Sequence, residues 1–143
     1  MDEGFFAELS TDLQRLGYSV RFRATGESMH PTIRAGEAIT VMPVAPSDLR
    51  IADVVLYRTE TSVLAHRVLC RQKAAGARGA FLVRGDACSD CDEPVAEDQI
   101  LGRVVSVERG GRRITLGRLP VKVFHLARLF AYRLKRRMER ISQ

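Results

Sequence analysis

The sequence has no tryptophan, only three cysteines and no long apolar run. A small, odd number of cysteines argues against a scaffold held together by disulfides. No stretch reaches the ~18 consecutive apolar residues that a membrane-spanning helix needs. Residues 1–4 include two acids where a secretory signal peptide would be basic, so no targeting peptide is expected. These absences predict a cytoplasmic location.

The composition is that of a globular protein, with 45% apolar and 28% charged residues in a chain of 143. This length suits one domain with a single substantial core. The net charge of +6 is unevenly spread. Residues 118–143 hold eight basic side chains and one acid, a net of +7, which leaves residues 1–117 at −1. Any attraction to an acidic partner would therefore come from the C-terminal segment.

Residues 18–117 contain short runs of apolar and β-branched residues punctuated by glycine, a pattern typical of β-strands. The runs 54–57 and 63–69 are separated by a polar turn and predict a hairpin. Predicted strands do not alternate with predicted helices, so we predict a mostly β domain with a barrel-like antiparallel sheet. The other expected strands are Val20 to Arg23, Ala38 to Val44, Ala80 to Arg84, Ile100 to Val107 and Arg113 to Leu116, with a loop over 74–79.

Helical spacing of apolar residues flanks this domain on both sides. Residues 1–17 predict a short amphipathic N-terminal helix that stops at Gly17. It is too short for a helix-turn-helix DNA-binding domain, which needs at least two packed helices. Residues 118–143 predict a basic amphipathic C-terminal helix over about 120–141.

The stretch 26–33 presents a serine, Ser28, on a tight bend between two expected strands. Gly26 permits unusual backbone angles, and Pro31 prevents a helix from running through. Serine is common in turns, so Ser28 alone has an ordinary structural interpretation. A nucleophilic role would need a base within hydrogen-bond reach and a third group to orient that base.

His66, inside the expected strand 63–69, is the histidine that a neighbouring strand could bring to Ser28. A lone strand histidine is more often structural than catalytic. The acidic loop after the next strand makes a catalytic role for His66 more plausible, because Asp86, Asp90 or Asp92 could supply the orienting carboxylate.

These segments resemble the boxes of the signal peptidase I and LexA-like serine peptidase superfamily. Residues 26–32 resemble its serine box, and residues 53–57 resemble the following Gly-Asp-Val-Val box. Residues 66–68 and 85–92 resemble boxes of the endoplasmic-reticulum and archaeal signal peptidases, in which histidine replaces the bacterial lysine base. The four boxes occur in the family's order and fall within residues 18–107. The resemblance implies the barrel-like fold of the LexA and signal peptidase type.

The resemblance also implies roles for individual residues. Ser28 would be the nucleophile, His66 the general base and Asp92 the orienting acid. Asp86 would be the box aspartate that supports the site. The implied reaction is amide hydrolysis through an acyl-enzyme, after a small residue of a peptide or protein substrate, and it uses no cofactor.

Gly26, Met29 and Pro31 would line the oxyanion hole or the substrate site, together with the Ser28 N–H. Signal peptidases commonly have a hydroxyl residue at the position of Gly26, so this oxyanion hole would be weaker or built differently. Ala52 also replaces the glycine of the second box. A LexA-like self-cleaving regulator is disfavoured, since too few residues precede Ser28 and His66 replaces the lysine.

The remaining signals are weak. Cys88 and Cys91 have the spacing of a metal or redox pair, with Cys70 as a third thiol, but a single such pair does not predict a metal site.

The C-terminal helix either packs on the body or lies on an anionic membrane surface, which would make the protein peripheral on the inner membrane face. Nucleic acid is not expected, because aromatic residues are scarce in the tail. We therefore predict a serine peptidase, with a non-catalytic peptide-binding module on the same fold as the alternative.

Overall fold

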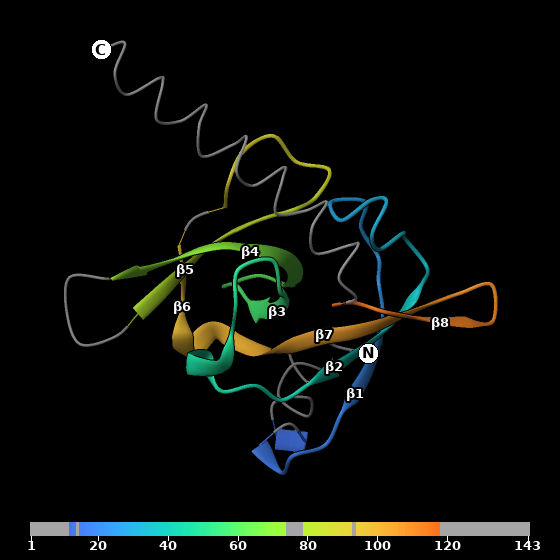
Figure 1. Ribbon diagram of the computed structural model, residues 1–143, viewed down its shortest axis with the longest axis horizontal. Helices are drawn as coiled ribbons and strands as arrows, with labels where there is room; N and C mark the ends of the chain where they lie inside the picture. The colour runs from blue at the N-terminus through green and yellow to red at the C-terminus, as the bar shows by residue number, and fades with distance from the viewer. Residues whose placement is uncertain (1–11, 14, 74–78, 93, 118–143) are drawn as a thin grey trace.

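The computed structural model describes residues 12–13, 15–73, 79–92 and 94–117. Its main feature is one curled antiparallel sheet that forms a half-barrel (Figure 1). The strands are β1 (Val20–Arg23), β2 (Ala38–Met42), β3 (Val54–Arg58), β4 (Val63–Lys73), β5 (Gly79–Arg84), β6 (Val95–Ala96), β7 (Ile100–Arg109) and β8 (Arg112–Thr115). Two short 3-10 helices, Pro46–Asp48 and Glu97–Gln99, lie in the connections.

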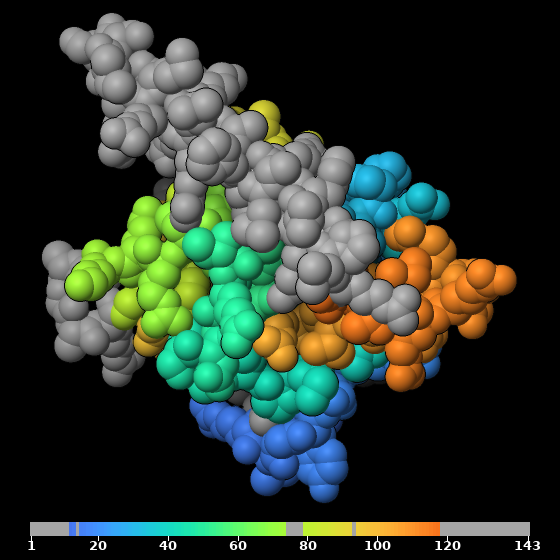
Figure 2. Space-filling view, in the orientation of Figure 1, coloured from blue at the N-terminus to red at the C-terminus, as the bar shows by residue number. Residues whose placement is uncertain are grey.

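The strand order in the sheet is β1-β2-β7-β3-β4-β5-β6, and β8 pairs with β7. The long strand β7 joins the two halves, because it pairs with β2, β3 and β8. The β7–β8 hairpin and the far ends of β4 and β5 lie at opposite ends of the molecule (Figures 1 and 2). The sheet thus brings β4, from the middle of the chain, close to the segments that follow β1 and β5.

Strand β3 is buried on both faces, and it separates two apolar clusters. Val54 and Leu56 belong to the first cluster, and Val55 and Tyr57 belong to the second. A strand that is covered on both faces has apolar residues at every position, not at every second one. Residues 54–57 have this pattern. The first cluster also contains Met29, Ile33, Ile39, Val41, Leu101, Val104 and Val107, and the second contains Leu49, Val68, Phe81, Val83 and Val95.

The structure confirms the mostly β, antiparallel and barrel-like architecture that the sequence predicts. The predicted hairpin is present, with Arg58 opposite Val63 across the turn. Strand β6 was not predicted, because two residues carry no periodic signal. The predicted loop over 74–79 lies largely outside the described residues, and Gly79 belongs to β5.

The predicted flanking helices lie mostly outside the described residues. Of the N-terminal helix the structure describes residues 12, 13 and 15, which are helical, whereas the C-terminal helix over 120–141 falls wholly in the undescribed segment. Across the ranges that the structure does describe, no helix combines the length and apolar character needed to cross a membrane.

Ala52, just before β3, has a backbone φ of 77°, in the left-handed region that favours glycine. Its amide donates to the carbonyl of Val68 at 2.9 Å, and its carbonyl accepts a bond from the Arg67 guanidinium at 2.7 Å. These contacts hold the strained conformation.

We expect Ala52→Gly to change the free energy of unfolding by less than about 1 kcal/mol. Relief of left-handed strain, about 1–2 kcal/mol, is offset by backbone entropy and a lost buried methyl group. Ala52→Val should cost more than about 2 kcal/mol, because a β-branched residue is a clear outlier at this φ. Chemical denaturation would measure both variants. Ala45→Val, at an exposed extended position, is the control, and an equal loss there would refute the backbone explanation.

Candidate active site

The turn after β1 presents Ser28 just before two buried side chains. Met29 and Ile33 are 3% and 2% exposed and belong to the first cluster, whereas Ser28 itself is half-buried. Main-chain bonds from His30 to Glu27 (3.1 Å) and from Ile33 to Met29 (3.0 Å) close the turn. The core therefore fixes the turn and leaves the serine at its surface.

The segment after β5 holds the same turn from the other side. The Ala87 N–H donates to the Ser28 carbonyl at 2.8 Å. A Cβ on Gly85 would lie 2.5 Å from that carbonyl oxygen and 3.1 Å from the Ser28 Cβ. Residue 85 must be glycine for steric reasons, because any side chain there would push the serine away.

Arg109, at the end of β7, holds the far end of the serine turn. Its guanidinium donates to the carbonyls of Pro31 (3.1 Å) and Thr32 (3.3 Å) and also pairs with Glu37. The hydrogen bond from Arg109 holds the pKa of the Glu37 carboxyl below its usual range. The turn is thereby connected to the central strand of the sheet.

His66, on β4, faces Ser28 and Asp92. Its Nε2 lies 3.0 Å from the Ser28 Oγ, and its Nδ1 makes a short contact with Oδ2 of Asp92. The histidine side chain is buried, whereas that of Asp92 is 32% exposed. The main chain of Asp92 is held by a 3.0 Å bond from its N–H to the Val83 carbonyl of β5. The structure thus brings together the three residues that the sequence singled out as nucleophile, base and orienting acid.

Tyr57 of β3 is part of the same cluster of polar side chains. Its hydroxyl donates to Oδ2 of Asp92 at 2.7 Å and lies 3.1 Å from Nδ1 of His66. Burial, followed by the bond to Asp92, raises the pKa of Tyr57 well above its usual value, so the hydroxyl stays protonated. Sequence reasoning did not assign Tyr57 to the site. The predicted hairpin contained the signal, since Val55 opposes His66 and Tyr57 therefore lies diagonally from His66 on the same face.

Asp86 lies in a second polar cluster that supports the serine turn. Arg67 donates to both of its carboxylate oxygens at 2.8 Å, and the Thr32 hydroxyl donates to Oδ2 at 2.6 Å. Both members of the ion pair have side chains that are 5% exposed. Arg67 follows His66 directly, so the two side chains project to opposite faces of β4.

The three residues predicted for substrate binding or the oxyanion hole are placed differently. Gly26 is exposed, and a Cβ there would meet open space. Met29 turns its side chain into the core, where its sulfur accepts a bond from the Asp86 N–H at 3.4 Å. Pro31 is exposed and, within the described residues, makes no hydrogen bond to Ser28, His66 or Asp92. The Met29 side chain is therefore not available to contact a substrate, whereas Gly26 and Pro31 lie at the surface.

Two backbone donors at the serine remain available. Within the described part of the chain, the N–H groups of Ser28 and Met29 make no hydrogen bond. An unpaired N–H beside a nucleophile is the feature that an oxyanion hole requires. With Gly26 in the preceding segment, no side-chain hydroxyl is available from that position.

The three cysteines lie in the described residues, and no disulfide joins any two of them. The Cys88 sulfur lies beside Gly85, 2.8 Å from where a Cβ on that glycine would be, so it borders the serine. Cys91 packs instead with Ala52 and Leu69. Among the residues that the structure describes, no group of three or more His, Cys, Asp or Glu side chains is arranged to hold a metal ion.

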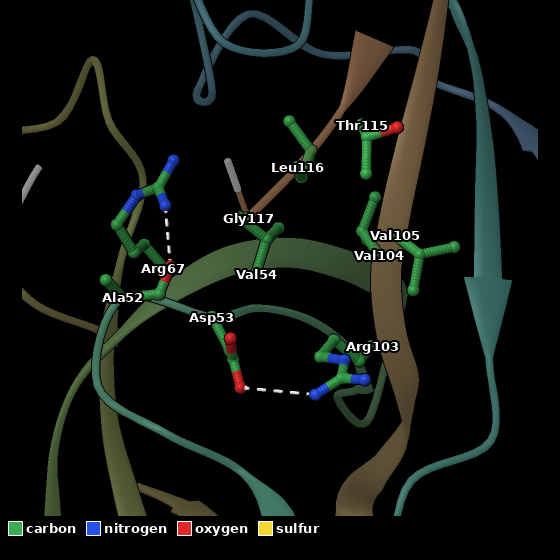
Figure 3. Close-up of a pocket in the computed structure, with 10 residues that line it drawn as sticks. All are labelled: Ala52, Asp53, Val54, Arg67, Arg103, Val104, Val105, Thr115, Leu116 and Gly117. Carbon is green, nitrogen blue, oxygen red and sulfur yellow. Dashed lines mark hydrogen bonds and ion pairs between the residues drawn. The ribbon is translucent and has the colours of Figure 1, made fainter. Parts of the chain in front are cut away.

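A separate pocket of about 380 Å³ lies between the start of β3, the middle of β7 and the chain after β8 (Figure 3). Asp53 and Arg103 face each other across it at 3.8 Å. Its lining includes Arg67 but not Ser28, His66 or Asp92. This pocket is therefore distinct from the serine cluster.

The serine cluster has the arrangement that activates a hydroxyl group. A neutral His66 that donates from Nδ1 to Asp92 has a lone pair on Nε2, which can accept the Ser28 proton. Asp92 would stabilise the imidazolium that forms. The chemistry open to this arrangement is nucleophilic attack by Ser28 on an acyl carbon.

Arg67→Met should destabilise the protein by roughly 3–5 kcal/mol, because it leaves the Asp86 carboxylate buried without its partner. The double variant Arg67→Met/Asp86→Leu should recover more than half of that loss, since no buried charge remains. Denaturant midpoints would report both effects. A loss below about 1 kcal/mol in the single variant would show that Asp86 is not held by this pair.

The sequence was also compared with known proteins. No family model matches this chain, and no curated protein matches it.

Proposed function

We propose that the chain is a serine peptidase of the signal-peptidase-like type. The observation that carries the proposal is the continuous contact from Ser28 Oγ to His66 Nε2, at 3.0 Å, and from His66 Nδ1 to Asp92. Here the serine, the histidine and the aspartate are ordered as nucleophile, base and orienting acid.

The proposed reaction follows from these contacts. Ser28 Oγ attacks the carbonyl carbon of a peptide bond while its proton passes to Nε2 of His66. The tetrahedral oxyanion accepts bonds from the free N–H groups at the serine. His66 then gives the proton to the departing amine, which leaves an ester on Ser28. A water molecule, deprotonated by His66, hydrolyses the ester and restores the serine.

The substrate class and the finer fold type rest on the resemblance of the four sequence boxes. We assign the half-barrel to the LexA and signal peptidase type, and the substrate to a peptide or protein cleaved after a small residue. The half-buried serine and the open surface at Gly26 would suit an extended chain with small side chains near the cleaved bond. Contact of the 120–141 segment with an anionic membrane surface stays a prediction.

One observation favours the alternative, a module that binds a peptide without cleaving it. Position 26 carries no hydroxyl group, so the oxyanion has backbone donors alone. Loss of one oxyanion donor typically costs 10²–10³ in rate, about 2.7–4 kcal/mol. A site weakened to this extent could hold a substrate while cleaving it very slowly.

Labelling by a fluorophosphonate probe tests the proposal. We expect the full-length protein to form an adduct on Ser28 at pH 7–8, located by mass spectrometry. Ser28→Ala should abolish the adduct. His66→Ala should slow labelling by roughly 10²–10⁴-fold, the usual contribution of a general base.

His30→Ala is the matched control, because His30 is exposed and its side chain has no hydrogen bond within the described residues. It should label at the wild-type rate. A folded wild-type protein without an adduct on Ser28, or labelling that does not depend on His66, would overturn the peptidase proposal and favour the binding module.

Gly26→Ser should increase the labelling rate by about 3- to 10-fold, by adding a side-chain donor near the oxyanion. The substitution is sterically permitted, because a Cβ at position 26 has no atom within 4 Å and the residue is not in the left-handed region. Gly26→Ala is the control, and it adds the Cβ without the hydroxyl. Equal rates in the serine and alanine variants would exclude a role for a hydroxyl at this position.

A further inference from the structure

We propose that Tyr57 is a positioning residue for this site. Its hydroxyl holds the Asp92 carboxylate so that His66 keeps its proton on Nδ1 and accepts from Ser28 on Nε2. This inference rests on the proposed function for its catalytic consequence, but the arrangement of protons can be measured independently.

The geometry places two polar atoms around one carboxylate oxygen. Oδ2 of Asp92 is contacted by Nδ1 of His66 and by the Tyr57 hydroxyl at 2.7 Å, and the hydroxyl lies 3.1 Å from Nδ1. The Tyr57 and His66 rings meet edge to face, with centroids 5.9 Å apart. The carboxylate oxygen is thus held from two sides by groups on adjacent, paired strands.

The proton count decides what this contact does. A phenol has one hydrogen to donate, and an ionised carboxylate can only accept. Because the carboxylate only accepts, Nδ1 of His66 must donate to Asp92, which leaves Nε2 to accept from Ser28. The Tyr57 bond to Asp92 keeps the hydroxyl hydrogen off Nδ1 and so supports this arrangement. If Tyr57 donated to Nδ1 instead, the histidine proton would move to Nε2, where it could not take the serine proton. The bond to Asp92 therefore selects the productive tautomer.

Asp92 needs this support because of where it lies. It follows β5 on a loop, its side chain is 32% exposed, and one main-chain bond to Val83 fixes its backbone. Tyr57 is 2% exposed and belongs to the buried strand β3. A rigid donor on a core strand thus fixes the rotamer of a carboxylate on a loop.

The surrounding groups leave the hydroxyl as a neutral donor. Burial, the bond to Asp92 and the neighbouring Cys88 all raise the pKa of Tyr57. The other charged pair, Arg67 and Asp86, is satisfied on the opposite face of β4. Among the described residues, the polar side chains that contact His66 are Ser28, Tyr57 and Asp92, and Cys88 adds to the raised pKa of Tyr57.

Tyr57→Phe tests the proposal in the full-length protein, because it removes the hydroxyl and keeps the ring. Labelling by the fluorophosphonate probe would be resolved into the maximal rate and the probe concentration at half that rate. We expect the maximal rate to fall about 10-fold, with the half-saturating concentration within about 2-fold of wild type. Tyr18→Phe, an exposed tyrosine, is the matched control and should change neither value. A maximal rate within 2-fold of wild type in Tyr57→Phe would overturn the proposal.

The same substitution in an Asp92→Ala background shows whether Tyr57 acts through Asp92. There the hydroxyl has no carboxylate to hold, so Tyr57→Phe should not lower the rate further. A second 10-fold loss in that background would show that Tyr57 acts independently of Asp92, and would refute the positioning role.

Nuclear magnetic resonance of His66 separates this inference from the peptidase proposal. In wild type and Tyr18→Phe, the ring nitrogens should report a proton on Nδ1 with a downfield proton resonance from the bond to Asp92. Tyr57→Phe should shift that resonance and mix the tautomers. If Ser28 fails to label but the resonance responds to Tyr57→Phe, the peptidase proposal fails and the positioning role stands. A His66 signal unchanged by Tyr57→Phe would sink the positioning role whatever the labelling shows.

Discussion

The site depends on the buried ion pair between Arg67 and Asp86. Two parallel hydrogen bonds fix the carboxylate, and with it the short segment that follows β5. The Ala87 N–H in that segment holds the Ser28 carbonyl. Because His66 precedes Arg67 on the same strand, both residues are positioned by one short piece of backbone. A shift in β4 would move both together, which keeps their separation constant.

The regular part of the fold was predictable because strand signals are local. The hairpin of β3 and β4 is marked by a polar segment between two apolar runs, and the turn between β7 and β8 by two consecutive glycines. The two-residue strand β6 was not predictable, since it exists only through pairing with β5. Likewise, the length of β4 to Lys73 follows from its partner β5 and not from apolar periodicity, because its last residues are exposed.

The site was predictable in its polar residues and less so in its supports. Ser28, His66 and Asp92 are chemically conspicuous, and the structure places them in contact. Tyr57 was missed because it lies within an apolar run, where a tyrosine is interpreted as part of the hydrophobic core. Met29 was expected near the substrate, yet its side chain lies in the core. Which side of a turn faces inward depends on packing from distant strands, and a local pattern does not contain that information.

The absence of a side chain at Gly85 has a consequence for how freely this protein can vary. The serine is located by the hydrogen bond to its own carbonyl and by a glycine that touches it, while the buried Met29 and Ile33 hold the rest of the turn. Glu27, His30 and Arg34 are exposed in the same turn, so substitutions there should leave Ser28 in place. Variation can accumulate on that outer surface, while position 85 stays closed to every residue with a Cβ.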